Sequence, residues 1–229
     1  MRWQGEGLDR LVRSTLADRP VTILDCSCGI GTQAIGLALR GHTVHATDIS
    51  ARAVERARHE ATAFDIDITF GVADMRALAE AVPGTFDVVL SCDNSLPHLI
   101  EDADVTTTLN GMRRKLRPNG PLLIGIRDYD PLTAERPQFT PPRLTGTPDQ
   151  RAIVFQRWDW ADDGATYDLT LFITRETAGG WQTTARSTTY RALRRDELTH
   201  LLAEAGFRDI RWHEPEAIPH HQPIVTACR

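Results

Sequence analysis

The sequence lacks the features that would place it in a membrane or outside the cell. None of its apolar runs approaches the roughly 20 residues that a membrane-spanning helix needs. Its first 14 residues contain no apolar segment of the kind a secretory signal requires, so we expect a cytoplasmic protein. Only four cysteines are present, and Cys26 and Cys28 are interpreted as free, buried residues. A metal site there is disfavoured, because no further cysteine or histidine pair follows at ligand spacing.

Lysine is almost absent, since Lys115 is the only one beside 25 arginines. Acidic residues outnumber basic ones by 31 to 26, which gives a formal net charge of −5. Proteins that bind nucleic acid usually present a basic face, so a nucleic-acid partner is not expected. The short basic run around Lys115 is better explained as favourable charge at the C-terminus of a helix.

The first half of the chain alternates short apolar runs with amphipathic segments. Such runs predict buried strands, and apolar spacing of three and four residues predicts helices. Strands separated by helices form parallel sheets, so we expect a Rossmann-like α/β fold with a mostly parallel seven-stranded sheet and helices on both faces. The predicted strands of this half are 21–26, 43–47, 66–70, 86–91 and 121–127, and the predicted helices are 32–40, one starting after Ser50, and 104–116.

The second half is richer in β-forming residues and begins with a proline-rich stretch. Residues 131–148 hold five of the 13 prolines and are expected to be irregular. Three alternating runs follow, separated by glycine-containing turns, and they predict an antiparallel insertion after the fifth strand. We therefore divide the chain into a core at 1–130 and 192–229 and an antiparallel substrate-lid insertion at 131–191. The three runs are 152–160, 166–175 and 181–190, and a helix at 195–205 and closing strands at 207–212 and 223–227 come after them.

The segment between the first predicted strand and the first helix, residues 24–34, is the most informative part of the sequence. It reads LDCSCGIGTQA, in which Gly29 and Gly31 allow a tight turn against which a ligand can lie. Ligands of open α/β sheets bind beside this loop, at the carboxyl ends of the strands. Asp48 follows about 20 residues later, where a carboxylate can accept hydrogen bonds from ribose hydroxyls.

Two cofactor classes remain open for this loop. GIGTQA also fits the G-x-G-x-x-A pattern of nicotinamide-dependent oxidoreductases, which is weak evidence by itself. Asp25 stands where it could face a ligand's ammonium group, and Asp74 stands where it could accept from the exocyclic amine of an adenine. Each could instead be a helix N-cap or a solvated loop residue. The chain offers no lysine- or tyrosine-based hydride-transfer site, which favours a different nucleoside cofactor.

Taken together, these residues resemble the class I S-adenosylmethionine-dependent methyltransferases. Residues 25–31 are similar to that family's D-x-x-C-G-x-G signature, 48–49 to its ribose-binding motif and 74–75 to its adenine-edge motif. The resemblance covers residues 20–127 and 195–228 and implies S-adenosyl-L-methionine as cofactor, S-adenosyl-L-homocysteine as product, and no metal. The cofactor-binding residues that it implies are Asp25, Cys28, Gly29, Gly31, Asp48, Ile49, Asp74, Met75 and Cys92.

A closer likeness is to the glycine and sarcosine N-methyltransferases. Residues 92–99, CDNSLPHL, resemble that group's G-N-S-x-x-H-L segment, and residues 127–130, RDYD, resemble its R-N-Y-D segment. In that group the asparagine and the arginine hold the amino-acid substrate, which implies the same roles for Asn94 and Arg127. The sequence departs from the group at its start, because it has no tyrosine before Tyr129, whereas the group covers its cofactor with a tyrosine-bearing N-terminal helix.

Methyl transfer from a sulfonium depends mainly on aligning the acceptor and excluding water. Arg127 could hold a carboxylate bidentately, or it could be a surface arginine paired with a neighbouring aspartate. His98 could accept the proton of an amine, or it could pack against the following helix. Residues 220–222 could line the pocket, although a surface loop is the favoured interpretation. The predicted catalytic residues are Asn94 and His98, and the predicted substrate-binding residues are Asn94, Arg127, Tyr129 and His221.

The sequence therefore predicts methyl transfer to a small-molecule acceptor, preferably the nitrogen of an amino acid or amine that bears a carboxylate. O- or C-methylation of a specialised metabolite is the alternative within the same class. An NAD(P)-dependent oxidoreductase and a non-catalytic S-adenosylmethionine-binding protein are the alternatives from other classes. The chain lacks the N-P-P-aromatic run of enzymes that methylate flipped-out bases. Neither a nucleic acid nor a membrane is expected as a partner, and assembly into a homo-oligomer is left open.

Overall fold

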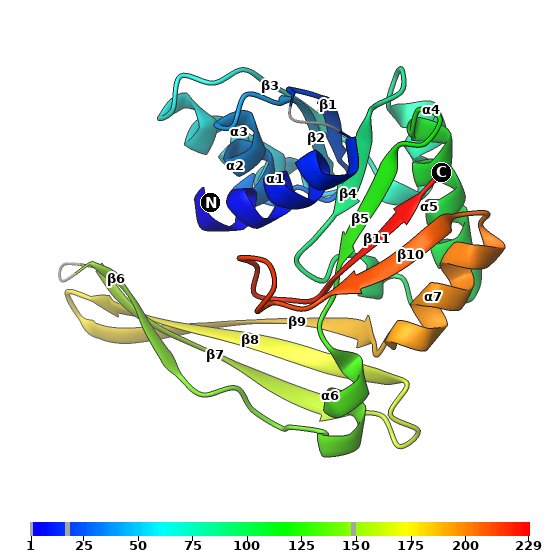
Figure 1. Ribbon diagram of the computed structural model, residues 1–229. Helices are drawn as coiled ribbons and strands as arrows, with labels where there is room; N and C mark the ends of the chain where they lie inside the picture. Colours follow the sequence, from blue (N-terminus) through cyan, green and yellow to red (C-terminus); the bar gives the residue numbers. More distant parts are fainter. Residues whose placement is uncertain (1, 17–18, 148–149) are drawn as a thin grey trace. The chain divides into compact units, whose positions relative to one another are not determined.

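The computed structural model describes residues 2–16, 19–147 and 150–229 (Figure 1). The chain divides into two compact units. The first unit comprises Met1–Leu96, Glu101–Arg127 and Asp196–Arg229, and the second comprises Pro97–Ile100 and Asp128–Arg195. Among the helices of the described residues, none is both long and apolar enough to cross a membrane.

A seven-stranded sheet organises the first unit, with strand order β10-β11-β5-β4-β1-β2-β3. The five central and edge strands β1 to β5 run parallel, while β11 is antiparallel to β5 and β10 is antiparallel to β11. The predicted fold class is confirmed. The strands are β1 (Thr22–Asp25), β2 (Thr43–Asp48), β3 (Ile68–Val72), β4 (Val88–Ser91), β5 (Pro121–Gly125), β10 (Arg208–His213) and β11 (Ile224–Cys228).

Helices lie on both faces of this sheet, with α1, α2 and α3 to one side and α4, α5 and α7 to the other in Figure 1. Ser50 caps α3 as predicted, since its hydroxyl accepts the Ala53 N–H at 3.3 Å. The basic run ends α5 as predicted, and Lys115 donates to the Ala79 carbonyl at 3.0 Å. The helices are α1 (Arg2–Leu16), α2 (Thr32–Ala38), α3 (Ala51–Thr62), α4 (Leu78–Ala81), α5 (Asp102–Lys115) and α7 (Arg195–Glu204), with 3₁₀ turns η1 (Met75–Ala77) and η2 (Leu96–His98).

Helix α1 is absent from the sequence-based prediction. Glycine is a poor helix former, and this helix contains both Gly5 and Gly7. The structure explains the glycines, because a Cβ at Gly5 would stand 2.6 Å from the backbone of Gly36 in α2. A Cβ at Gly7 would stand 2.8 Å from the carbonyl oxygen of Pro219. Close packing of two backbones thus outweighs local helix propensity.

The second unit is built on a four-stranded antiparallel sheet with the order β6-β7-β8-β9. The expectation that 131–148 is irregular is wrong for two segments, which form a helix and the strand β6. Pro131 lies in the first turn of the helix, where a missing N–H costs little, while Pro148 lies outside the described residues. The role of 131–191 as a substrate lid stays a prediction. The elements are α6 (Tyr129–Glu135), β6 (Arg143–Thr147), β7 (Gln150–Trp160), β8 (Thr166–Thr177) and β9 (Gly180–Arg191).

Candidate functional site

Asp25 is the last residue of β1, at the carboxyl end of the parallel sheet. Its side chain is buried, and Oδ1 accepts the backbone N–H of Ser27 at 3.2 Å. Its Oδ2 is buried and has no hydrogen-bond partner among the described residues. Burial, reinforced by the nearby carboxylates of Asp93 and Asp48, raises the pKa of Asp25 to about 8. A cation placed against Oδ2 would reverse this effect and ionise the group.

The glycine bend follows directly after Asp25. Gly29 and Gly31 have φ angles of 52° and 87°, in the left-handed region that favours glycine. The Cys28 N–H donates to the Thr47 carbonyl at 2.9 Å, which ties the bend to the end of β2. Apart from Gly29 itself and its two chain neighbours, no atom of the described residues lies within 4 Å of the place that a Cβ on Gly29 would take, so this side of the bend is open to a ligand.

Asp48 connects the end of β2 to this bend. Its Oδ2 accepts the Gly29 N–H and its Oδ1 accepts the Ser50 N–H, both at 2.8 Å. Each carboxylate oxygen can accept further hydrogen bonds, so ribose hydroxyls can still be bound. Ile49 and Val72 are 65% and 57% exposed, and Val72 pairs with Asp48 in the sheet. An exposed apolar surface could hold the base of a nucleoside, and a carboxylate beside it that can accept further hydrogen bonds could hold the sugar.

Asp74 follows β3 and has a structural role in the protein. It is the N-cap of η1, because its Oδ1 accepts the Arg76 N–H at 2.9 Å. Arg76 also forms ion pairs with Asp74 at 2.7 Å and with Asp104 at 3.0 Å. Hydrogen bonds from the Arg76 side chain lower the pKa of Asp74, which is therefore ionised at neutral pH. Met75, the neighbouring cofactor candidate, is the first residue of η1 and is half-buried.

The cysteines near the bend are buried free thiols, as predicted for Cys26 and Cys28. Cys92, the residue after β4, is also buried. Burial raises the pKa of each of these three thiols above its ordinary value, and the Asp25 carboxylate raises it further. Thiols of this kind are inert as nucleophiles, so any contact that they make with a cofactor is by packing.

Asn94 and Arg127 are brought together at the ends of β4 and β5. Asn94 is buried, and its backbone N–H donates to the Gly125 carbonyl at 3.0 Å. Its side-chain Oδ1 accepts the backbone N–H of Arg127, also at 3.0 Å. Asn94 therefore holds the backbone on which Arg127 stands. Arg127 is half-buried at the carboxyl end of the sheet, consistent with its candidate role toward an anionic group.

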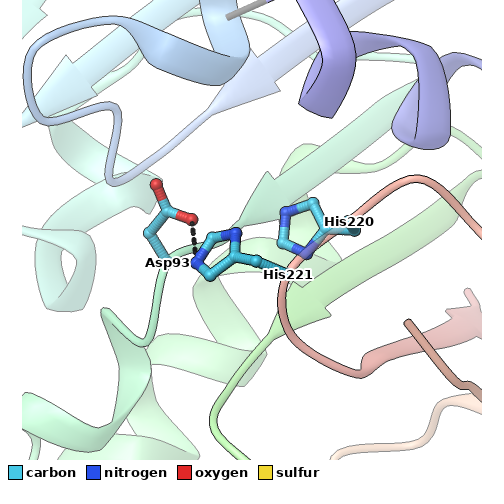
Figure 2. A group of neighbouring side chains, drawn as sticks. All are labelled: Asp93, His220 and His221. Atoms are coloured by element: carbon cyan, nitrogen blue, oxygen red, sulfur yellow. Dashed lines mark ion pairs between the residues drawn. The ribbon is translucent and has the colours of Figure 1, made fainter. Parts of the chain in front are cut away.

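Asp93 was not singled out from the sequence, although it lies two residues beyond β4, as Asp25, Asp48 and Asp74 lie at or just beyond the ends of β1, β2 and β3. Its carboxylate accepts from Gln33 Nε2 at 2.7 Å and lies 3.3 Å from His221 Nε2 (Figure 2). Gln4 of α1 reaches His221 Nδ1 at 2.7 Å. Position at a strand end is the sequence signal for Asp93. The contributions of Gln4 and His221 depend on α1 and on the loop before β11.

The loop before β11 is only partly a surface loop. His221 is exposed, but His220 is 1% and Gln222 9% exposed, so the surface interpretation of 220–222 is wrong for these two residues. Two adjacent imidazoles therefore differ sharply in environment. Burial lowers the pKa of His220, which keeps its ring neutral at pH 7.

Two further candidates belong to the second unit. His98 packs on Tyr190 with ring centroids 4.2 Å apart, and its Nδ1 lies 3.4 Å from the Thr188 hydroxyl. Tyr129 is fully buried, and its hydroxyl lies 3.0 Å from that of Tyr167. Their predicted catalytic and substrate-binding roles stay predictions.

Comparison with known proteins agrees with this geometry. A methyltransferase-domain family model matches residues 23–120. A glycine/sarcosine N-methyltransferase of Parasynechococcus marenigrum (strain WH8102) is 31% identical over 57% of this chain and 46% of its own length. Another, from Aphanothece halophytica, is 24% identical over 87% of this chain and 71% of its own length. Ubiquinone biosynthesis O-methyltransferases also match, over less than half of the chain.

Solved structures extend the likeness to the complete fold. CalS10, an amino pentose methyltransferase from Micromonospora echinaspora solved with its methyl donor bound, superposes with a TM-score of 0.80. It is 19% identical to this chain, and the superposition covers 100% of this chain and 92% of that protein. The strand order, the glycine bend and the matched domain lead to one conclusion. Residues 23–120 match the methyltransferase-domain family, and the described residues have the Rossmann-like fold of S-adenosylmethionine-dependent methyltransferases.

Proposed function

We propose that this protein transfers the methyl group of S-adenosyl-L-methionine to a small-molecule acceptor, and that the acceptor is an amine or amino acid bearing a carboxylate. The observation that carries the proposal is Asp25, whose buried Oδ2 has no hydrogen-bond partner in the described part of the chain and lies beside an open glycine bend. A buried oxygen without a partner costs free energy, which a cationic ligand group would recover. The ammonium of the methionine portion is such a group.

The other candidates accommodate the rest of the cofactor. Asp48 supplies acceptors for ribose hydroxyls, and the exposed Ile49 and Val72 supply apolar surface for an adenine. Asp74 can accept from the exocyclic amine while it remains the cap of η1. The bound cofactor supplies an electrophilic methyl group, so the protein needs to hold the acceptor in line and keep water away.

An acceptor carboxylate would be held by Arg127, whose guanidinium can form two parallel hydrogen bonds with it. Asn94 acts as a positioning residue, because it fixes the backbone of Arg127. An acceptor ammonium must lose its proton before its nitrogen can attack, so the rate is expected to rise with pH below the pKa of that amine. The relatives include both N- and O-methyltransferases, and a panel of acceptors separates these two activities.

The first test is cofactor binding by isothermal titration calorimetry with S-adenosyl-L-homocysteine. Asp25→Asn removes the negative charge and keeps the shape, so we expect affinity to fall about 10- to 100-fold, the worth of a charge-assisted hydrogen bond. Asp67→Asn is the matched control, because Asp67 is exposed and precedes β3 at the opposite end of that strand. Equal affinity of the Asp25→Asn protein and the wild type would contradict the assignment.

The second test identifies the acceptor. The protein is incubated with methyl-labelled cofactor and a panel of amino acids, amines and hydroxyl compounds, and the products are read by mass spectrometry. We expect label on nitrogen of a carboxylate-bearing compound. Arg127→Ala should then raise KM for that compound about tenfold or more, while the KM for cofactor changes little. If only hydroxyl compounds were labelled, the proposed N-methylation would be wrong and the activity would be O-methylation.

A further inference from the structure

Three side chains of the first unit form a cluster that methyl transfer by itself does not require. Asp93 follows β4, and His220 and His221 lie in the loop before β11. One ligand atom from each lies within 4.8 Å of the other two, and His221 Nε2 is 3.3 Å from Asp93 Oδ1 (Figure 2). Two imidazoles and one carboxylate are a common ligand set for divalent first-row metals.

The buried imidazole of His220 is the observation that points to a ligand. Its Nε2 is buried and has no hydrogen-bond partner among the described residues. Its Nδ1 lies 3.1 Å from the Gln222 carbonyl oxygen and 3.3 Å from the Gln222 N–H. When Nδ1–H donates to that carbonyl, Nε2 presents a buried lone pair. Metal-bound histidines usually hold their second nitrogen in this way.

The other two members of the cluster are supported similarly. Gln33 donates to the second oxygen of Asp93 at 2.7 Å, and Gln4 lies 2.7 Å from His221 Nδ1. Rotation of the Gln4 amide places its oxygen against Nδ1–H, which frees His221 Nε2 to act as a ligand. Asp93 and His221 are therefore each contacted by a glutamine side chain, and His220 by the backbone of Gln222. Supporting hydrogen bonds of this kind fix ligands in metal sites.

We propose that Asp93, His220 and His221 bind a divalent transition-metal ion, with zinc as the reference case. Ligand atoms around tetrahedral zinc stand about 3.3 Å apart, since each bond is about 2.0–2.1 Å. The His221–Asp93 separation already has this value, and the ligand atom of His220 lies within 4.8 Å of the other two. A hydrogen-bonded His221–Asp93 pair without metal would leave the buried Nε2 of His220 unexplained.

The site has a consequence for the acceptor, and this part rests on the proposed function. Three protein ligands leave a coordination position open, as in catalytic zinc sites. Asp25 ends β1 and Asp93 lies two residues beyond β4, and these two strands are parallel neighbours. The ion would therefore lie at the same end of the sheet as the proposed cofactor site. A carboxylate or hydroxyl oxygen of the acceptor can occupy the open position.

The test measures metal binding without cofactor or acceptor. Full-length protein is treated with a chelator, desalted and titrated with Zn²⁺ by calorimetry, and with Co²⁺ by visible absorption. We expect one ion per chain and visible bands typical of a cobalt site with nitrogen and oxygen ligands. Asp93→Asn and His221→Gln should each weaken metal binding by about 10- to 100-fold or more. In metal sites generally, changing a residue that only supports a ligand already costs about 10- to 100-fold in affinity.

A matched control separates this cluster from other surface histidines. His200 is exposed and lies 3.2 Å from Glu204, so it offers a histidine–carboxylate pair outside the cluster. His200→Gln should leave binding unchanged. Because His220 is buried, His220→Gln is interpreted only if its circular dichroism and melting temperature without metal match the wild type. If His220→Gln does not fold like the wild type, the variants of the exposed residues, Asp93→Asn and His221→Gln, decide whether the cluster binds metal.

Binding that is absent, or unaltered in Asp93→Asn and His221→Gln, would overturn the metal site. These outcomes are independent of the proposed function. Methyl transfer by a protein that takes up no metal would remove only this inference. Stoichiometric metal uptake by a protein that binds no S-adenosyl-L-homocysteine would remove only the proposed cofactor site.

Discussion

In the first unit the strands β4 and β5 are buried along their whole length, whereas in the second unit β6 and most of β9 are exposed. The first sheet carries its polar candidates at or just beyond the ends of its strands, while its central strands β4 and β5 are mostly apolar. The second sheet carries neutral pairs across its strands, such as Thr170 with Ser187 and Thr174 with Thr183, both at 2.9 Å.

This difference teaches how each unit is stabilised. Burial of apolar side chains dominates the first, where a fully buried leucine contributes about 1.5–3 kcal/mol. The second relies on long strand pairing and on an aromatic cluster at one end, in which Tyr167 packs on Trp158, Trp160 and Tyr190 at centroid distances of 4.7–5.5 Å. The buried strands of the first sheet form a rigid support, which keeps the acidic side chains at the strand ends in fixed positions.

The strongest test of this comparison is truncation of a central strand residue. Leu90 of β4 is 0% exposed, and Leu90→Ala should lower the free energy of unfolding by about 2–5 kcal/mol through cavity formation. Ile173 of β8 is half-buried, so Ile173→Ala should cost less. Urea unfolding monitored by circular dichroism measures both. Similar losses at the two positions would remove the distinction between the units.

The pH dependence of stability tests the charged groups at the strand ends. Burial raises the pKa of Asp25 from 3.8 to about 8, so the folded state holds a proton that the unfolded state releases. Stability from this group is fully present below about pH 4 and is lost as pH rises toward 8. Asp25→Asn should flatten the unfolding free energy over that window. An unchanged slope in the variant would show that Asp25 is ionised in the folded protein.

The smallest effect is expected in the exposed sheet of the second unit. Thr174→Val removes the hydroxyl that contacts Thr183 but keeps a β-branched shape. Cross-strand pairs of this kind contribute about 0.2–1 kcal/mol. Because this pair is exposed, Thr174→Val should lower the free energy of unfolding by an amount near the lower end of that range. Chemical denaturation of Thr174→Val, Thr183→Val and the double variant measures the coupling. A loss of unfolding free energy as large as that of Leu90→Ala would mean that polar pairs across the strands stabilise the second unit as strongly as apolar burial stabilises the first.

Much of the first sheet could be predicted because its signals are local. The apolar run of β1, the two glycines and Asp48 lie within about 25 residues, and their order alone predicts a strand, a bend and a second strand. The same reasoning failed for α1, because its glycines lower helix propensity and their purpose is contact with α2. It also failed for residues 129–147, where prolines between α6 and β6 obscured both elements.

By itself, the sequence determined the α/β fold, the glycine bend and the acidic residues at the strand ends, because spacing along the chain specifies which residues follow each strand. Only the tertiary structure decided that Asp25 keeps an oxygen without a hydrogen-bond partner among residues 2–16, 19–147 and 150–229. It also decided that Asn94 holds the backbone of Arg127, and that Asp93 lies beside two histidines more than 120 residues later in the chain. The physical reason is that burial, orphaned hydrogen-bond acceptors and contacts between distant residues arise from packing, which local patterns do not encode.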